Sequence, residues 1–227
     1  MPQRDPFRVS EVASRRTGLA KPPLSRDAIV EEALRQFTSD DDGAVTLRKI
    51  AKALDTGPAS LYAYVDDMGE LQALVLDRAL AAVEVDRAGG PWRERLEALL
   101  GSYVRVLMAS PSLARMAFRT TAVGPNALRL SEALLELLAE AGVDRLTAAW
   151  ALDLLTTFVT SVAAEHAQGP DPAAPEGPVA QALDRAPASA YPRIHAAREE
   201  LLSGTGEERF AWSLDVLLRG ILSRAQS

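Results

Sequence analysis

Apolar residues recur every three or four positions along almost the whole chain from Ser25 onward, and this periodicity limits the possible folds most strongly. Ile29, Ala33 and Phe37 form the first such row, shortly after Ser25. A row with this spacing marks one face of an amphipathic helix, and a serine before it can accept hydrogen bonds from the free N–H groups of the first turn. No segment shows the apolar–polar alternation of a strand. We therefore expect an all-α protein.

Glycine, proline and capping residues divide the pattern into separate helices. The run Ser39–Gly43 ends the first helix, Thr46 caps a short second one, and Pro58 suits the first turn of a third. Asp66-Asp67 caps a long fourth helix, which we expect to end near Gly89. Further along, the pattern predicts helices over residues 92–109, 112–121, 126–141, 146–168, 179–186, 191–203 and 206–224.

Charge is distributed unevenly along the chain. The net charge is −6, yet the first 64 residues carry ten Lys and Arg against nine Asp and Glu, and all three lysines lie there. We expect a basic, flexible arm over residues 1–24, a three-helix head over 25–70 and a larger, acidic helical body over 71–227, joined to the head by the fourth helix. A basic end on an acidic body suits a protein that touches a polyanion with that end only, although a basic tail without function has the same composition.

Composition excludes several kinds of active site. The chain has no cysteine, which rules out disulfides, thiolate zinc sites and cysteine nucleophiles. It has two histidines, His166 and His195, and although His166 follows Glu165, adjacent residues of a helix point in different directions. We expect no metal site and no cofactor. Without a Gly-rich phosphate loop or a catalytic constellation we expect no enzyme either, although catalysis by two of the 31 carboxylates stays conceivable.

Two segments bear on the compartment of the protein. Residues 1–24 are polar and basic, without the apolar core of a secretory signal, and the lack of cysteine suits a reducing compartment. The run from Leu146 to Ala164 approaches the length of a membrane span, about 20 residues, but Asp153 lies in its middle and several threonines and a serine dilute it. We expect a buried or interface helix there, in a cytoplasmic protein.

The three short helices, with Gly57 in the tight turn between the last two, predict a helix-turn-helix. In that motif the last helix enters the major groove of DNA with one face and packs on the first two helices with the other. If Leu61 and Val65 face inward, small side chains remain to approach base edges, and tyrosine hydroxyls remain to donate to phosphates. These outward residues are Pro58, Ala59, Ser60, Tyr62 and Tyr64.

Basic side chains of the preceding helix extend this predicted surface. Arg48 is long enough to reach a base edge, most favourably guanine O6 and N7, and Lys49 and Lys52 can hold phosphates. Taken singly, Arg48 could be an ordinary surface arginine, and Tyr62 and Tyr64 could be packing aromatics. Their combination favours DNA binding.

Three segments, Thr46–Leu54, Pro58–Val65 and Glu70-Leu71, resemble the DNA-binding domain of the tetracycline-repressor (TetR) family. The spacing of Leu61, Tyr62, Tyr64 and Val65 is the most specific part. This resemblance implies a homodimeric, ligand-responsive transcription regulator that binds double-stranded DNA at a palindromic operator. It further implies the following contacts: Thr46 contacts or caps against a phosphate, Arg48, Pro58, Ala59 and Ser60 face base edges, and Tyr62 and Tyr64 grip phosphates.

Two positions depart from the family pattern. Gly57 stands where the family usually has a Ser-like cap of the recognition helix. Met68 stands where the family usually has a phosphate-binding lysine, just before the fourth helix. We expect the basic residues of the arm to replace the missing charge.

The body resembles the C-terminal domain of the tetracycline-repressor branch at Ser110–Leu113, Gly124–Arg129 and Trp150–Glu165. This resemblance implies a ligand cavity, and a four-helix interface made by two late helices of each subunit. Residues 146–164 and 210–222 are also apolar over more of their circumference than a one-sided surface helix needs, which suggests a partner. A helix buried inside the monomer would show the same pattern.

Residues of mixed polarity at helical spacing are candidates for the cavity, because ligand sites are mostly apolar with a few placed polar groups. One face of the helix over 146–168 carries Trp150, Leu154, Thr157, Ser161 and Glu165. Other walls are expected from Tyr103, Leu107, Met108, Met116 and Phe118. Each of these residues could equally be plain core. The expected effector is a small, mostly apolar molecule.

These inferences together predict a repressor that an effector releases from DNA. The fourth helix joins head and body, so a ligand that favours another tilt of this helix would change the spacing of the two recognition helices. An activator of the same fold, and a helical adaptor that has lost DNA binding, are the alternatives.

Overall fold

The computed structural model describes residues 23–39, 44–85, 89–167 and 177–225, and within these ranges it has helices and no strands. The predicted all-α class is confirmed. The chain divides into two compact units, Met1–Ala167 and Gln168–Ser227. Residues 1–22 of the predicted arm lie outside the described residues, and the predicted boundary between head and body at residue 70 stays a prediction.

The head is formed by the first helices of the first unit. They are α1 (Arg26–Phe37), α2 (Leu47–Ala53), α3 (Pro58–Leu61) and α4 (Met68–Leu80). Ser25 Oγ accepts from Ala28 N at 3.1 Å and Thr46 Oγ1 accepts from Lys49 N at 3.2 Å, which confirms two predicted caps. Asp67 caps α4 in the same way. Regular helix in α3 ends at Leu61, where a turn follows. The predicted end of the fourth helix near Gly89 is wrong, because α4 ends at Leu80.

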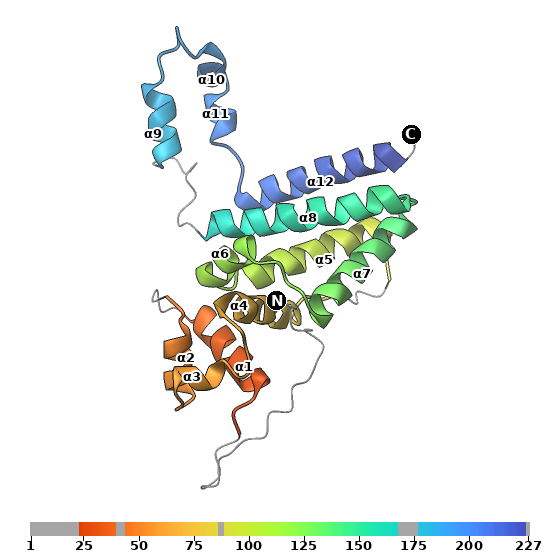
Figure 1. The fold of residues 1–227 in the computed structure, drawn as a ribbon. Coiled ribbons are helices and arrows are strands. Elements are labelled where there is room, and N and C mark those ends of the chain that lie inside the picture. Colours follow the sequence, from red (N-terminus) through yellow and green to blue (C-terminus); the bar gives the residue numbers. More distant parts are fainter. Residues whose placement is uncertain (1–22, 40–43, 86–88, 168–176, 226–227) are drawn as a thin grey trace. The chain divides into compact units, whose positions relative to one another are not determined.

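Apolar side chains from all four helices form the core of the head. Ile29 of α1, Ile50 of α2, Leu61 of α3 and Leu71 of α4 are fully buried. α1 packs on α4 and α2 packs on α3. Figure 1 shows α1, α2 and α3 as one cluster, from which α4 runs toward the later helices of the unit.

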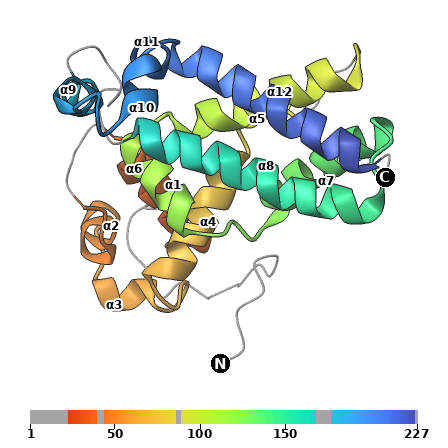
Figure 2. The same cartoon turned by 90° about the horizontal axis from the view of Figure 1, so that it is seen from above.

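The remainder of the first unit is a helical bundle. It consists of α5 (Trp92–Leu107), α6 (Pro111–Arg119), α7 (Pro125–Glu140) and α8 (Arg145–His166). α8 packs against α5, α6 and α7, and Figure 2 shows it alongside α6 and α7. α8 is long and apolar enough for a membrane span by composition. However, its row Ala151, Leu155 and Val159 is buried among these helices, which is how a core helix packs.

The described residues of the second unit, 177–225, form four helices. They are α9 (Pro178–Arg185), α10 (Pro192–Ala196), α11 (Arg198–Leu201) and α12 (Gly206–Ala225). The single helix predicted over 191–203 is wrong, because α10 and α11 are separated at Ala197. Thr205 and Glu208 start α12 with a reciprocal capping box, in which Glu208 N donates to Thr205 Oγ1 and Thr205 N donates to Glu208 Oε2.

Candidate functional site

The helix-turn-helix exposes most of the residues that the sequence assigns to DNA. On α2, Ile50 and Ala51 are buried, so the opposite side of the helix faces solvent. Leu61 and Val65 hold the following segment to the core in the same way. The side chains left exposed are Thr46, Arg48, Lys49, Lys52, Pro58, Ala59, Ser60 and Tyr62.

The two tyrosines of this segment differ in their surroundings. Tyr62 is 53% exposed. Tyr64 is only 6% exposed, and its hydroxyl donates to Leu24 O at 2.7 Å. This placement corrects the predicted phosphate contact of Tyr64, because its hydroxyl already binds the segment that leads into α1. Tyr64 therefore positions the start of α1.

The turn between α2 and α3 sets the direction in which α3 starts after the end of α2. Asp55 adopts a left-handed conformation with φ of 51°, which aspartate tolerates better than most side chains. Thr56 N donates to Ala51 O at 2.9 Å and Asp55 N donates to Lys52 O at 3.1 Å. These bonds close the end of α2 and direct the chain into Pro58 at the start of α3.

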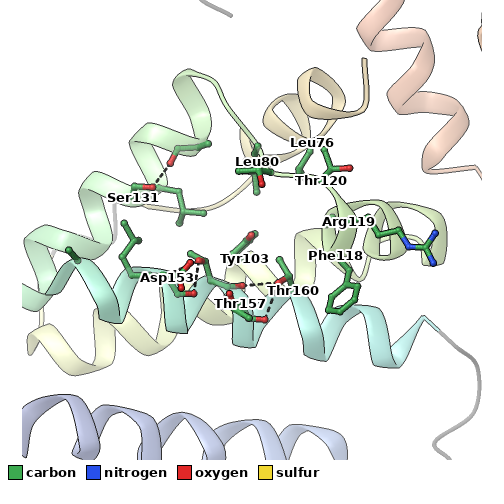
Figure 3. Close-up of a pocket in the computed structure, with 18 residues that line it drawn as sticks. Leu76, Leu80, Tyr103, Phe118, Arg119, Thr120, Ser131, Asp153, Thr157 and Thr160 are labelled. Atoms are coloured by element: carbon green, nitrogen blue, oxygen red, sulfur yellow. Dashed lines mark hydrogen bonds between the residues drawn. The ribbon is translucent and has the colours of Figure 1, made fainter. Parts of the chain in front are cut away.

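A cavity of about 480 Å³ lies among the later helices of the first unit (Figure 3). Its walls come from α4, α5, α6, α7, α8 and the link after α6. The larger apolar lining residues are Leu76, Leu80, Phe118, Leu130 and Leu152. The polar lining residues are Tyr103, Arg119, Thr120, Thr121, Ser131, Asp153, Thr156, Thr157 and Thr160. The cavity is thus more polar than the sequence indicates.

Tyr103 is the most buried polar group of this lining. Its side chain is 5% exposed, and burial raises the pKa of its hydroxyl to about 12, because the phenolate would lose its hydration. Tyr103 therefore stays neutral at physiological pH. Within the part of the chain that the structure describes, no side chain or carbonyl pairs with its hydroxyl.

α4 connects the helix-turn-helix to the cavity. It packs against α1, and its residues Leu76 and Leu80 line the cavity. On the α1 side, Arg26 Nη2 lies 2.6 Å from Glu70 Oε1, and Arg78 pairs with Asp27 and Glu31 of α1. Movement of α4 at the cavity would therefore be transmitted to α1.

A reciprocal pair of contacts holds α4 to α7. The buried Asp77 of α4 accepts from Ala127 N at 2.9 Å and from Asn126 Nδ2 at 3.0 Å, so its carboxylate caps α7. Arg129 of α7 donates to the carbonyls of Leu80, Ala81 and Val83 at the end of α4. A carboxylate at a helix start and a guanidinium at a helix end are the favourable arrangement for both helix dipoles.

A second connection runs through α6. Ser110 caps this helix by accepting from Leu113 N at 3.0 Å, and its hydroxyl donates to Phe37 O at the end of α1. The other end of α6 supplies Phe118 and Arg119 to the cavity. α6 thus spans the distance from the cavity to the head.

Comparison with known proteins identifies the family. A family model described as "Tetracyclin repressor-like, C-terminal domain" matches residues 86–225. The chain belongs to the tetracycline-repressor (TetR) family. The family predicted from the head is therefore confirmed by a match to the body.

Relatives of this TetR-family chain are transcription regulators. The HTH-type transcriptional repressor DrrR1 of Streptomyces coeruleorubidus is 30% identical over 145 residues, which are 63% of this chain and 54% of DrrR1. The chain spans about half the length of the curated relatives it matches.

Solved structures share its fold over most of their length. The transcription regulator SCO7704 from Streptomyces coelicolor is 42% identical, with a TM-score of 0.76 over 89% of this chain and 96% of that protein. ActR of Streptomyces coelicolor, solved in complex with actinorhodin, is 32% identical, with a TM-score of 0.78 over 91% of this chain and 100% of ActR.

Three of the ten predicted effector residues line the cavity of this TetR-family chain, namely Tyr103, Phe118 and Thr157. Of the others, Leu107 and Met116 are buried, Met108 and Ser161 are half-buried, and Trp150, Leu154 and Glu165 are exposed. None of these seven belongs to the lining. On α8 the lining row is instead Ala149, Asp153, Thr156 and Thr160, one residue away from the predicted row. One residue turns a helix by about 100°, so a different face meets the cavity.

Sequence reasoning missed most of the polar lining. Asp153, Thr156 and Thr160 follow one another at steps of three and four residues in a mainly apolar helix, and this spacing is a signal that could have identified the wall. Thr120 and Thr121 belong to the link between α6 and α7 and carry no such pattern. Only the tertiary structure brings them to the cavity. Among the described residues, no group of three or more His, Asp or Glu could hold a metal ion.

Proposed function

We propose that this chain is a ligand-responsive DNA-binding regulator, and that it is a repressor which binds a palindromic operator as a homodimer until a small-molecule effector releases it. The observation that carries the proposal is the position of α4, which packs on α1 and also supplies Leu76 and Leu80 to the cavity. The name of its relative DrrR1 supports repression. We expect a non-enzymatic protein that acts in the cytoplasm, where bacterial DNA lies.

The exposed face of α2 and α3 supplies the DNA contacts in this proposal. Base edges are met by Arg48, Pro58, Ala59 and Ser60, and phosphates by Thr46, Lys49, Lys52 and Tyr62. Thr46 Oγ1 accepts from Lys49 N to cap α2, which leaves the hydroxyl hydrogen free to donate to a phosphate. Tyr64 is not among these contacts, because its hydroxyl binds Leu24 O.

Exposed apolar side chains support the homodimer. Leu146, Trp150 and Leu154 form one row along α8, and Trp150 is 70% exposed. In the second unit, α12 exposes Trp212 and Val216. Exposed apolar patches of this kind mark interaction surfaces, and a two-fold dimer presents the same patch from both copies. Such a dimer must place its two recognition helices about 34–36 Å apart to bind successive major grooves.

Release by a ligand follows from the two connections to the head. A ligand that favours another position of α4 or α6 strains the contacts of these helices with α1, which include the Ser110–Phe37 hydrogen bond. Couplings of this kind are typically about 1–3 kcal/mol. The relative ActR, solved with actinorhodin and with (S)-DNPA, supports a small molecule as the effector.

Selection of bound duplexes from a random-sequence pool tests this function. We expect enrichment of an inverted repeat, and about a tenfold or greater loss of affinity for it in Arg48→Ala. Arg105→Ala, at an exposed position of α5, is the control and should bind like the unaltered protein.

Two outcomes separate the proposal from its alternatives. If no duplex is retained above background, the helical adaptor is favoured and the regulator is excluded. If an inverted repeat is retained but a reporter under its control rises when the protein is present, the protein is an activator.

A further inference from the structure

Three hydroxyl groups on two walls of the cavity are already committed as hydrogen-bond donors. Thr156 Oγ1 donates to Leu152 O at 2.9 Å and Thr160 Oγ1 donates to Thr156 O at 3.0 Å, both within α8. On α7, Ser131 Oγ donates to Ala127 O at 2.9 Å. A hydroxyl has one hydrogen, and a carbonyl can only accept. These three oxygens therefore offer only lone pairs to a ligand.

Asp153 adds a negative charge to this acceptor-rich surface. It lines the cavity on the same helix as Thr156 and Thr160. Its carboxylate takes part in no ion pair or hydrogen bond with the residues that the structure describes. Figure 3 shows Asp153, Thr157 and Thr160 along the α8 wall, with Tyr103 beside them.

The positive charge at the cavity does not neutralise Asp153. Arg119 is the basic residue of the described lining, and it lies on the exposed end of α6. Figure 3 shows its guanidinium directed away from Asp153 and Tyr103. Asp153 is exposed as well, so a cation in the cavity would meet its carboxylate at a solvent-accessible part of the lining, with the Arg119 guanidinium directed elsewhere.

The remaining lining favours an apolar body on the same ligand. Leu76 and Leu80 of α4, Phe118 of α6 and Leu130 of α7 bound the cavity. Its volume of about 480 Å³ suits a molecule of a few fused rings, since ligand sites are commonly about 300–1,000 Å³.

We propose that the cavity takes a cationic amphiphile: a ring-containing apolar body with a protonated amine at Asp153, and hydroxyl or amine donors facing Ser131, Thr156 and Thr160. The role of this ligand as an effector rests on the proposed function, but its binding does not. This proposal replaces the expected mostly apolar effector. It also predicts discrimination against carboxylates at this wall, where they would meet the charge of Asp153 and the committed oxygens of Thr156 and Thr160.

Three fluorescent probes with one ring system test the charge preference. They are 9-(aminomethyl)anthracene, 9-anthracenemethanol and anthracene-9-carboxylate, titrated into the full chain without DNA at pH 7. We expect the amine to bind about tenfold more tightly than the alcohol, a difference of about 1.4 kcal/mol, and the carboxylate to bind most weakly.

Two substitutions locate the preference at the cavity. Asp153→Asn should reduce amine binding to the level of the alcohol while alcohol binding stays unchanged, because only the charge is removed. Glu132→Gln removes a carboxylate from an exposed position of α7 outside the lining, and it should leave the preference intact.

Several results would overturn the proposal: equal binding of amine and alcohol, tighter binding of the carboxylate, an amine preference that survives in Asp153→Asn, or no binding of any probe. DNA selection decides the proposed function separately. An inverted repeat without amine preference refutes the cavity chemistry alone, and amine preference without DNA binding refutes the regulator alone.

Discussion

The role of a single residue in this chain depends on its burial and not only on its residue type. Tyr62 and Tyr64 are two positions apart and belong to the same turn after α3. Tyr62 faces solvent, whereas Tyr64 is buried and bonded to Leu24 O. The same side chain is thus available to a phosphate at one position and part of the fold at the other.

Matched substitutions separate these two roles. Tyr62→Phe should weaken binding to the selected operator about tenfold and leave stability unchanged, since only a phosphate donor is lost. Tyr64→Phe should lower the free energy of unfolding by about 1 kcal/mol, because Leu24 O loses its partner. Electrophoretic mobility shifts and urea unfolding measure the two effects. A larger loss of stability in Tyr62→Phe than in Tyr64→Phe would contradict the placement.

Tyr103 makes stability depend on pH in the alkaline range. Its pKa is about 12 in the folded state and about 10 in an unfolded chain. Between these values the unfolded chain loses the proton first, so the stability present below pH 10 is lost as the pH rises to 12. The loss is about 3 kcal/mol for two pKa units.

Unfolding by urea at a series of pH values measures this dependence. Tyr103→Phe should flatten the fall in unfolding free energy between pH 10 and 12. Tyr191→Phe, at an exposed tyrosine, is the matched control for the loss of a phenol. Equal slopes in Tyr103→Phe and in the unaltered protein would show that Tyr103 ionises as freely in the fold as in water.

At the scale of elements, α4 and α7 are joined by polar groups at their ends. Asp77 caps α7, and Gly124 precedes that helix with no room for a side chain, because an added Cβ would overlap the Asp77 carboxylate. Any residue could adopt the φ of 178° found at Gly124. Glycine is therefore needed here for the close approach and not for the backbone conformation. The requirement for glycine at position 124 is therefore imposed by the Asp77 side chain of α4.

A double-mutant cycle tests this dependence. Asp77→Ala should lower the free energy of unfolding by about 1–3 kcal/mol, because it leaves part-buried donors of α7 unpaired. Gly124→Ala should destabilise the unaltered protein but cost much less in the Asp77→Ala background, where the carboxylate is gone. Thermal or urea unfolding of the four proteins gives the coupling. Additive effects would mean that Asp77 is not what excludes the side chain.

The three faces of α8 have different surroundings. One row is buried in the unit, a second lines the cavity, and a third, with Leu146, Trp150 and Leu154, is exposed. Two of these rows are apolar, whereas the cavity row carries Asp153, Thr156 and Thr160. We propose that the exposed row is covered by the second copy of the dimer.

A charge on the exposed row should weaken self-association. Trp150→Glu should shift the protein from dimer toward monomer by at least about tenfold in dissociation constant, since it removes an aromatic anchor and buries a charge. Sedimentation velocity over a dilution series measures the shift. Arg105→Glu, at an exposed position of α5, is the control for added negative charge. An unchanged dissociation constant in Trp150→Glu would place the interface elsewhere.

For the whole molecule, the proposed DNA binding depends more on where the charges lie than on the net charge. The net charge is −6, and the basic arm over residues 1–24 contributes Arg4, Arg8, Arg15, Arg16 and Lys21. Met68 lacks the cationic group that the family usually has at this position. We propose that the arm contacts DNA and replaces this contact, as basic arms do in other DNA-binding proteins.

Removal of residues 1–20 should weaken operator binding and flatten its salt dependence. Each lost phosphate contact reduces the log–log slope by about 0.9. Fluorescence anisotropy at a series of salt concentrations measures the slope. A truncated protein with the same slope as the full chain would show that the arm makes no phosphate contact.

Helix positions and the head could be predicted from the sequence because their signals are local. The caps at Ser25 and Thr46 act within one turn, and prolines such as Pro111 and Pro125 open helices by their own geometry. The spacing of Leu61 and Val65 likewise fixed the inner side of the α3 segment. The split of the predicted helix at Ala197 is an exception, because no glycine or proline marks it.

The sequence by itself determined that this is an all-α chain, where most of its helices begin and end, and to which family it belongs, because caps, breaks and short motifs depend on neighbouring residues. Which side of α8 faces the cavity, where the hydroxyl of Tyr64 binds and why Gly124 has no side chain were decided by the tertiary structure alone. Helical periodicity shows that a face is apolar, but the partner of that face is set by segments distant in the sequence. For the same reason the polar lining of the cavity, gathered from four helices and a link, has no counterpart in any one stretch of the chain.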